Sequence, residues 1–86
     1  MKYLIILVLL GSGLVFAAPT QQEEKVIKDA AESIGINLSF SREINQGNIA
    51  KKCQWDFKML KLDIKKTPQV EEMARDYCVK EWKSLQ

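Results

Sequence analysis

The sequence contains no histidine, only two cysteines and only two prolines. Without histidine, the chain cannot form a histidine zinc site, a Ser-His-Asp or Cys-His catalytic group, or an imidazole pH switch. It also lacks a glycine-rich phosphate loop, a nucleophile elbow, a paired-cysteine metal motif and an EF-hand loop. Most carboxylates have a lysine or arginine three or four positions away, as on exposed helix surfaces. We therefore expect no enzymatic activity, no cofactor and no metal.

Apolar residues are concentrated at the N-terminus, where the first 18 of 86 residues hold 14 of the 40 apolar side chains. Lys2 precedes the apolar stretch 3–16, two alanines follow, and a polar stretch begins at Thr20. The apolar run is shorter than the roughly 20 residues that a membrane span requires. This pattern predicts a cleaved secretory signal peptide over residues 1–17, or 1–18, with an uncleaved anchor as the alternative. We expect a secreted, extracellular protein with one small domain, 18–86.

Three helices are predicted in that domain, which makes the expected fold class all-α. The first helix covers residues 21–34, because Thr20 and Glu23 fit a capping box and Gly35 offers a C-terminal stop. Its apolar face contains Val26, Ile27, Ala30, Ala31 and Ile34. Residues 35–48 form a connector with an alternating, strand-like start. We expect its apolar residues to close one end of the core: Ile36, Leu38, Phe40 and Ile44.

The second helix is predicted over residues 48–65. Its core-facing stripe at the 3.6-residue period consists of Ile49, Cys53, Phe57, Leu60 and Ile64. The third helix starts with Thr67 as N-cap and Pro68 in the first position and ends near Ser84. Its inward face contains Val70, Met73, Ala74, Tyr77, Cys78 and Leu85.

Cys53 and Cys78 are predicted to form a disulfide, because an even cysteine pair in a secreted chain is most simply bridged. If the second and third helices form an antiparallel hairpin that turns near residue 66, the numbers of facing residues add to about 133. Cys53 and Cys78 add to 131, and both lie on apolar faces. The same register pairs two further sets of residues, Phe57 with Ala74 and Ile49 with Trp82. The expected architecture is a bundle of about three helices with a disulfide-linked C-terminal hairpin.

Two groups of residues on the second helix are candidates for binding a partner. A second apolar stripe lies nearly opposite the core stripe and consists of Trp55, Met59 and Leu62. A basic flank lies between the two stripes and consists of Lys51, Lys58, Lys61 and Lys65. One interpretation is structural: the helix is central and buries its second stripe against the first helix, while the lysines form a solvated surface. The other interpretation makes the stripe, with Phe40 and Trp82 as additions, a binding site. Asn37-Leu38-Ser39 is also an acceptor sequence for N-glycosylation at Asn37.

Part of the chain resembles insect odorant- and pheromone-binding proteins. The resemblance covers about 20 residues and rests on Ser33-Ile34-Gly35-Ile36, Ser41-Arg42-Glu43-Ile44, Gly47 and Lys52-Cys53. It implies a secreted helical protein that carries small apolar ligands. That family usually has six cysteines, whereas this chain has Ala31 near the first expected cysteine and Phe57 where another is expected. A relative of the family would therefore be shortened and cysteine-poor.

We expect a non-enzymatic protein that acts by binding. The partners we consider are a small apolar ligand, a lipid surface or an extracellular protein. Nucleic acid is not expected, because the domain has few arginines and a small net charge. The alternative is a venom-type or host-directed polypeptide that acts on membranes through the basic amphipathic helix 49–65. The protein is expected to be a monomer or a weak dimer.

Overall fold

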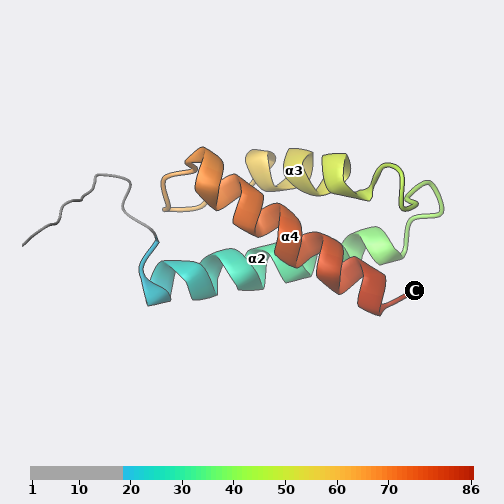
Figure 1. Ribbon diagram of the computed structural model, residues 1–86, viewed down its shortest axis with the longest axis horizontal. Helices are drawn as coiled ribbons and strands as arrows, with labels where there is room; N and C mark the ends of the chain where they lie inside the picture. The colour runs from blue at the N-terminus through green and yellow to red at the C-terminus, as the bar shows by residue number, and fades with distance from the viewer. Residues whose placement is uncertain (1–18) are drawn as a thin grey trace, which may run out of the picture.

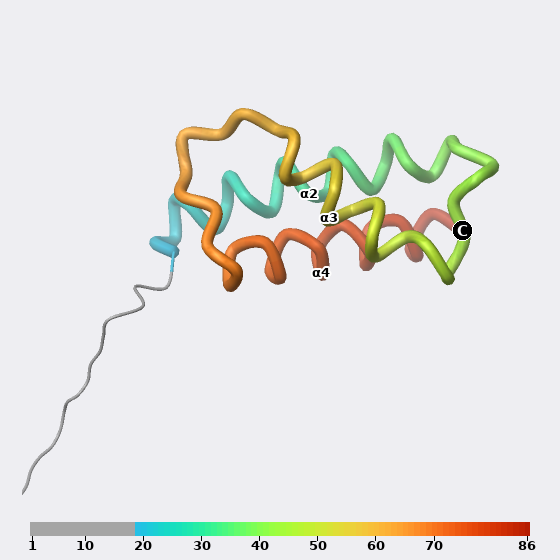
Figure 2. The backbone as a smooth tube through the Cα atoms, turned by 90° about the horizontal axis from the view of Figure 1, so that it is seen from above, coloured from blue at the N-terminus to red at the C-terminus, as the bar shows by residue number. Residues whose placement is uncertain are grey.

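The computed structural model describes residues 19–86, so the predicted signal peptide lies outside the described residues. Within this range the chain forms three helices and no strand: α2 (Gln21–Ser39), α3 (Ile49–Met59) and α4 (Pro68–Ser84). Helix α4 packs against both other helices, which touch each other less. It runs in the same direction as α2, whereas α3 runs in the opposite direction (Figures 1 and 2). A disulfide joins α3 to α4, and the predicted all-α bundle is thereby confirmed.

Helix α2 begins as predicted and ends later than predicted. The Thr20 hydroxyl accepts a hydrogen bond from the Glu23 backbone N–H at 3.1 Å, and the Glu23 carboxylate accepts one from the Thr20 N–H at 2.9 Å. The predicted stop at Gly35 is wrong, because Gly35 is buried within the helix, which continues to Ser39. A Cβ at Gly35 would lie 2.6 Å from the carbonyl oxygen of Cys78. Glycine is therefore needed here for close contact between two helices and not for chain termination.

The longer α2 changes which residues of segment 35–48 reach the core. Leu38 is buried and Ile44 is partly buried against the core, as predicted. Ile36 and Phe40 are 41% and 81% exposed, so the prediction that they close the core is wrong. The physical reason is the period: residues two apart share a face in a strand, but lie about 200° apart around a helix.

Helix α3 ends at Met59, so the predicted helix up to Lys65 is wrong. Leu60 leaves the helix with an extended backbone, φ −71° and ψ 140°. In the segment 60–65 that follows, apolar and polar residues alternate, and the partly buried ones are Leu60, Leu62 and Ile64. All three of these side chains pack against the core, although the segment bends at residues 63 and 64. A continued helix would have turned Leu62 away from it.

Lys66 caps the C-terminal end of α3. Its Nζ donates hydrogen bonds to the carbonyl oxygens of Phe57 and Lys58 at 3.0 Å each, and also to the carbonyl oxygen of Leu60. The same Nζ lies 5.3 Å from the centroid of the Phe57 ring. The last carbonyl groups of a helix have no partner within the helix and carry partial negative charge. Lys66 therefore stabilises the point at which α3 ends and the non-helical segment 60–65 begins.

Helix α4 begins and ends as predicted. The Thr67 hydroxyl accepts a hydrogen bond from the Val70 N–H at 3.2 Å, and Pro68 occupies the first turn. The buried residues of α4 recur every four positions: Val70, Ala74, Cys78 and Trp82. Leu85, which was predicted to face inward, is 49% exposed because it is the C-cap, beyond the last buried residue of the helix. The prediction for Leu85 is wrong.

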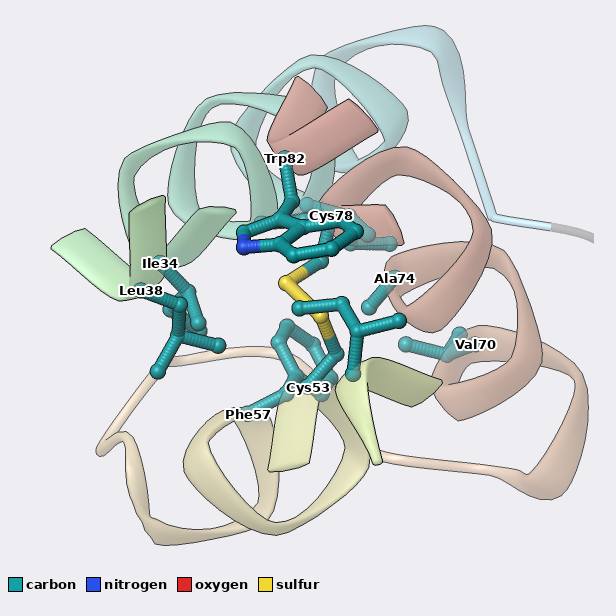
Figure 3. Close-up of a cluster of buried hydrophobic side chains, with 11 residues drawn as sticks. Ile34, Leu38, Cys53, Phe57, Val70, Ala74, Cys78 and Trp82 are labelled. Atoms are coloured by element: carbon teal, nitrogen blue, oxygen red, sulfur yellow. A yellow bond between two sulfur atoms is a disulfide. The ribbon is translucent and has the colours of Figure 1, made fainter. Parts of the chain in front are cut away.

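The core surrounds the predicted disulfide, which is confirmed. Cys53 and Cys78 are joined with a Cα–Cα distance of 5.9 Å, within the usual range for a disulfide. Figure 3 shows Trp82 and Phe57 on either side of the two sulfur atoms, with Ile34 and Leu38 beside them. All members of the register pairs are buried, namely Ile49, Trp82, Phe57 and Ala74.

Candidate functional site

The side of α3 that faces away from the disulfide carries two large exposed apolar side chains. The buried residues of α3 are four apart and centred on Cys53. At 100° per residue, Trp55 lies about 200° from Cys53, nearly opposite the core. Trp55 is 59% exposed, and Met59, one turn further along, is 66% exposed. Residues four apart are neighbours on a helix surface, so these two side chains form one exposed apolar strip.

Two lysines flank this strip. Lys51 lies four residues before Trp55 and Lys58 three residues after it, and both are exposed. These spacings place each lysine beside Trp55 on the helix surface. We call Lys51, Trp55, Lys58 and Met59 the outer α3 face.

The structure corrects two expectations about the candidate stripe. Helix α3 is not the central element, since α4 packs against both other helices and the stripe residues on α3 are exposed rather than buried against α2. Leu62 does not belong to the stripe, because it follows the end of α3 and packs partly against the core.

The two residues named as additions are also separated from the stripe. Trp82 is 4% exposed and belongs to the core. Phe40 is exposed but is the C-cap of α2. The outer α3 face therefore contains neither of them.

The predicted basic flank is divided between two elements. Lys51 and Lys58 lie on α3, whereas Lys61 and Lys65 are exposed positions of the non-helical segment 60–65. The prediction of one continuous helical flank is therefore wrong. Among residues 19–86, none of these four lysines forms a salt bridge, while Lys52 pairs with Asp56 at 3.4 Å.

Charge is distributed unevenly along the described chain. Residues 49–66 contain six lysines and two aspartates, a net charge of +4. The other described residues contain six basic and nine acidic side chains, a net charge of −3. The positive charge is thus concentrated on α3 and the segment that follows it, the part of the bundle that also carries the outer α3 face.

Two hollows of the described surface lie along α4, away from the outer α3 face. The first has a volume of about 410 Å³ and is lined by Ala50 of α3 and by five residues of α4: Arg75, Asp76, Val79, Lys80 and Lys83. The second, of about 450 Å³, is lined by Met73 and Tyr77 together with polar and charged side chains: Glu24, Gln69, Glu72, Asp76 and Lys80. Both are open to solvent, and neither is lined by Trp55 or Met59.

A further group of exposed apolar residues lies at one end of the bundle. The C-terminal ends of α2 and α4 lie at the same end (Figures 1 and 2), and the exposed residues there are Ile36, Phe40 and Leu85. Asn37, the glycosylation acceptor, is also exposed in this last part of α2. A glycan at Asn37 would thus extend from α2 and not from the outer α3 face.

Within residues 19–86, no group of three or more acidic, cysteine or histidine side chains could hold a metal ion. None of the helices in the same range is long and apolar enough to cross a membrane.

No protein-family model, curated protein or solved structure matches the chain. The resemblance to odorant-binding proteins therefore stays a prediction.

Proposed function

We propose that the chain is a secreted, non-enzymatic protein that acts by binding a partner through the outer α3 face. The exposure of Trp55 at the centre of this face carries the proposal. Tryptophan combines a large apolar ring with one hydrogen-bond donor, and it is enriched among the residues that contribute most to binding. A mainly exposed tryptophan next to an exposed methionine supplies apolar surface that is not buried in the core of the bundle.

The disulfide supports this proposal because it determines how α3 is rotated. Cys53 is bonded to Cys78 in the core, and Trp55 is only two residues further along the same helix. Rotation of α3 that would bury Trp55 would have to expose Phe57, which is 1% exposed. The outer α3 face is therefore presented in one orientation before any partner binds, which reduces the entropy lost on binding.

The packing of the interior favours surface binding over transport of a ligand inside the bundle. The eleven core side chains are at most 7% exposed, and Figure 3 shows them gathered around the disulfide. The two hollows described above are open to solvent, and charged side chains border both of them. A small apolar ligand would therefore find its apolar contacts on the outer α3 face.

Binding of the neutral apolar dye Nile red to the oxidised protein tests the proposal. We expect a saturable rise in fluorescence and about tenfold weaker binding of the Trp55→Ala variant, because about 1.5 kcal/mol of apolar burial is lost. Phe40→Ala is the matched control, because it removes a more exposed aromatic ring elsewhere. The proposal is overturned if the folded oxidised protein does not bind the dye, or if Phe40→Ala weakens binding as much as Trp55→Ala.

Secretion is tested by expressing the whole chain in a eukaryotic secretory system and measuring the mass of the product in the medium. We expect an N-terminus at Ala18 or Pro19 and a mass two hydrogens below that of the reduced chain. A further mass increment that disappears in Asn37→Gln would identify the glycan. Retention of the uncleaved chain in the membrane fraction would contradict secretion.

A further inference from the structure

We propose that the outer α3 face docks on an anionic lipid surface, with α3 parallel to the plane of the membrane. This inference rests on the proposed function, because it assigns a partner to the same face. Trp55 and Met59 would enter the boundary between headgroups and acyl chains, and the surrounding lysines would contact anionic headgroups.

Charge complementarity is the first argument. The net charge of +4 on residues 49–66 is opposed by −3 on the remaining described residues. A molecule with this asymmetry is turned by a negative surface so that α3 and the segment 60–66 approach it first. Four exposed lysines without a salt bridge to a described residue are available there: Lys51, Lys58, Lys61 and Lys65. Each basic residue near an anionic leaflet contributes attraction that falls off within a Debye length.

The composition of the face favours lipid over an acidic protein. Lysine is depleted at the centre of protein interfaces, where a well-packed apolar core is required. Here each apolar side chain of the outer α3 face has a lysine three or fewer positions away, and only two large apolar side chains are exposed on α3. Tryptophan flanked by lysine is typical of interfacial helices, in which the ring enters the headgroup region and the lysine stems extend along it.

The shape of the surface agrees with a flat partner. Trp55 and Met59 project from the outer side of a helix, and neither lines one of the two hollows along α4. A projecting strip inserts into a fluid interface without a complementary groove in the partner. The projecting strip on α3 therefore suits a helix that lies on the membrane.

The two tryptophans of the chain provide an internal test, because Trp55 is 59% exposed and Trp82 is 4% exposed. In the Trp82→Phe variant, the emission reports Trp55 alone. We expect vesicles of phosphatidylcholine with phosphatidylserine to shift this emission to the blue and to protect it from acrylamide, and vesicles of phosphatidylcholine alone to do neither. In the Trp55→Phe variant, the emission of Trp82 is expected to stay unchanged, because the bundle remains folded.

Lysine variants test whether attraction between these lysines and anionic lipid contributes to binding. Replacing Lys51 and Lys58 together by glutamine is expected to weaken partition to the anionic vesicles about 30-fold, at about 1 kcal/mol for each lysine. Replacing Lys25 and Lys83 together by glutamine is the matched control. It removes the same charge from exposed positions of α2 and α4. It is expected to change partition less than about threefold, because these lysines lie on helices other than the docked one and attraction to the leaflet falls off within a Debye length.

Several outcomes would overturn the assignment. Equal binding to neutral vesicles, or equal loss in the two lysine double variants, would exclude recognition of anionic lipid by this face. A shift of Trp55 emission with soluble polyglutamate and none with vesicles would assign the face to an acidic protein. In each case, Nile red binding that depends on Trp55 would leave the proposed function intact, whereas the loss of both signals would overturn both proposals.

Discussion

Gly35 of α2 lies in direct contact with the backbone of Cys78 in α4. A Cβ at Gly35 would lie 2.6 Å from the Cys78 carbonyl oxygen and 3.1 Å from the Cβ of Glu81. Because Cys78 is bonded to Cys53 of α3, all three helices are connected at this residue. The glycine determines how closely α2 approaches, and the disulfide determines how closely α3 does.

Gly35→Ala is expected to lower the free energy of unfolding by about 1–3 kcal/mol, the usual cost of overpacking. Alanine gains about 1 kcal/mol in helix propensity over glycine. That gain is smaller than the cost of separating two backbones, because the closest atom belongs to a carbonyl group that cannot rotate away. Chemical denaturation followed by circular dichroism measures the change.

Ser33→Ala is the control for this prediction, since Ser33 is an exposed position of the same helix. Its effect is expected to stay within about 0.5 kcal/mol. Equal stability of Gly35→Ala and the parent protein would show that α2 and α4 are further apart than described here.

Removing the disulfide by the double substitution Cys53→Ala and Cys78→Ala is expected to cost about 3.5 kcal/mol. This value follows from the chain entropy of closing a loop with a sequence separation of 25. A domain of this size has little stability beyond such a contribution, so we expect loss of most of the helical circular dichroism signal. An unchanged denaturation midpoint in the double variant would contradict the prediction.

The helix starts, the disulfide and most of the core could be predicted from the sequence. Thr20 and Thr67 are N-caps whose partners lie within three residues, so local spacing identifies them. The cysteines could be paired because both lie on apolar faces and their numbers fit one hairpin register. The N-caps depend on neighbouring residues in the sequence, and the cysteine pair depends on the register of one antiparallel hairpin.

The C-terminal ends of α2 and α3 could not be predicted, because they depend on contacts between residues far apart in the sequence. Gly35 has the local properties of a C-terminal stop, and only its contact with Cys78 explains why the helix continues. The end of α3 depends on Lys66, which reaches back to carbonyl groups six to nine residues earlier. The alternation of apolar and polar residues over 60–65 is the sequence signal that the helix has ended. A helical period fits Leu60 and Ile64 equally well, so the sequence does not decide between the two.

The candidate site could also be predicted only in part, because its extent depends on where α3 ends. Trp55 and Met59 lie within α3, and their placement opposite Cys53 follows from the helical period. Leu62 was assigned to the same stripe by that period, and the end of the helix at Met59 removed it. The predicted stripe therefore forms one exposed helical strip only up to the residue at which the helix ends, and its role in binding stays a prediction.

Lys66→Met is expected to lower stability by about 1–2 kcal/mol, because the last turn of α3 loses a cationic donor to three carbonyl groups. Amide hydrogen exchange should accelerate most in the last turn of α3. Lys65→Met is the matched control, since Lys65 is exposed and is expected to have almost no effect. Equal exchange rates in the two variants would exclude a capping role for Lys66.

Leu62→Ala is expected to lower stability by about 1–2 kcal/mol, less than the roughly 2–5 kcal/mol of a fully buried leucine, because Leu62 is partly buried. The same variant is expected to bind Nile red as the parent does. Trp55→Ala is expected to show the reverse pattern, with weaker dye binding and almost unchanged stability. If Leu62→Ala bound the dye more weakly but kept full stability, Leu62 would be part of the binding surface after all.

The oxidised protein is expected to bind anionic vesicles without releasing their contents. The 11 residues of α3 span about 16 Å, about half of the roughly 30 Å hydrocarbon core of a bilayer. The disulfide also keeps Phe57 and Ile49 inside the bundle, so Trp55 and Met59 are the large apolar side chains that α3 offers for insertion. Release of an encapsulated dye, measured at protein concentrations that saturate the shift of Trp55 emission, checks this expectation. Release that is abolished when Lys58 and Lys61 are both replaced by glutamate would contradict it and would favour a membrane-active, toxin-like role over docking.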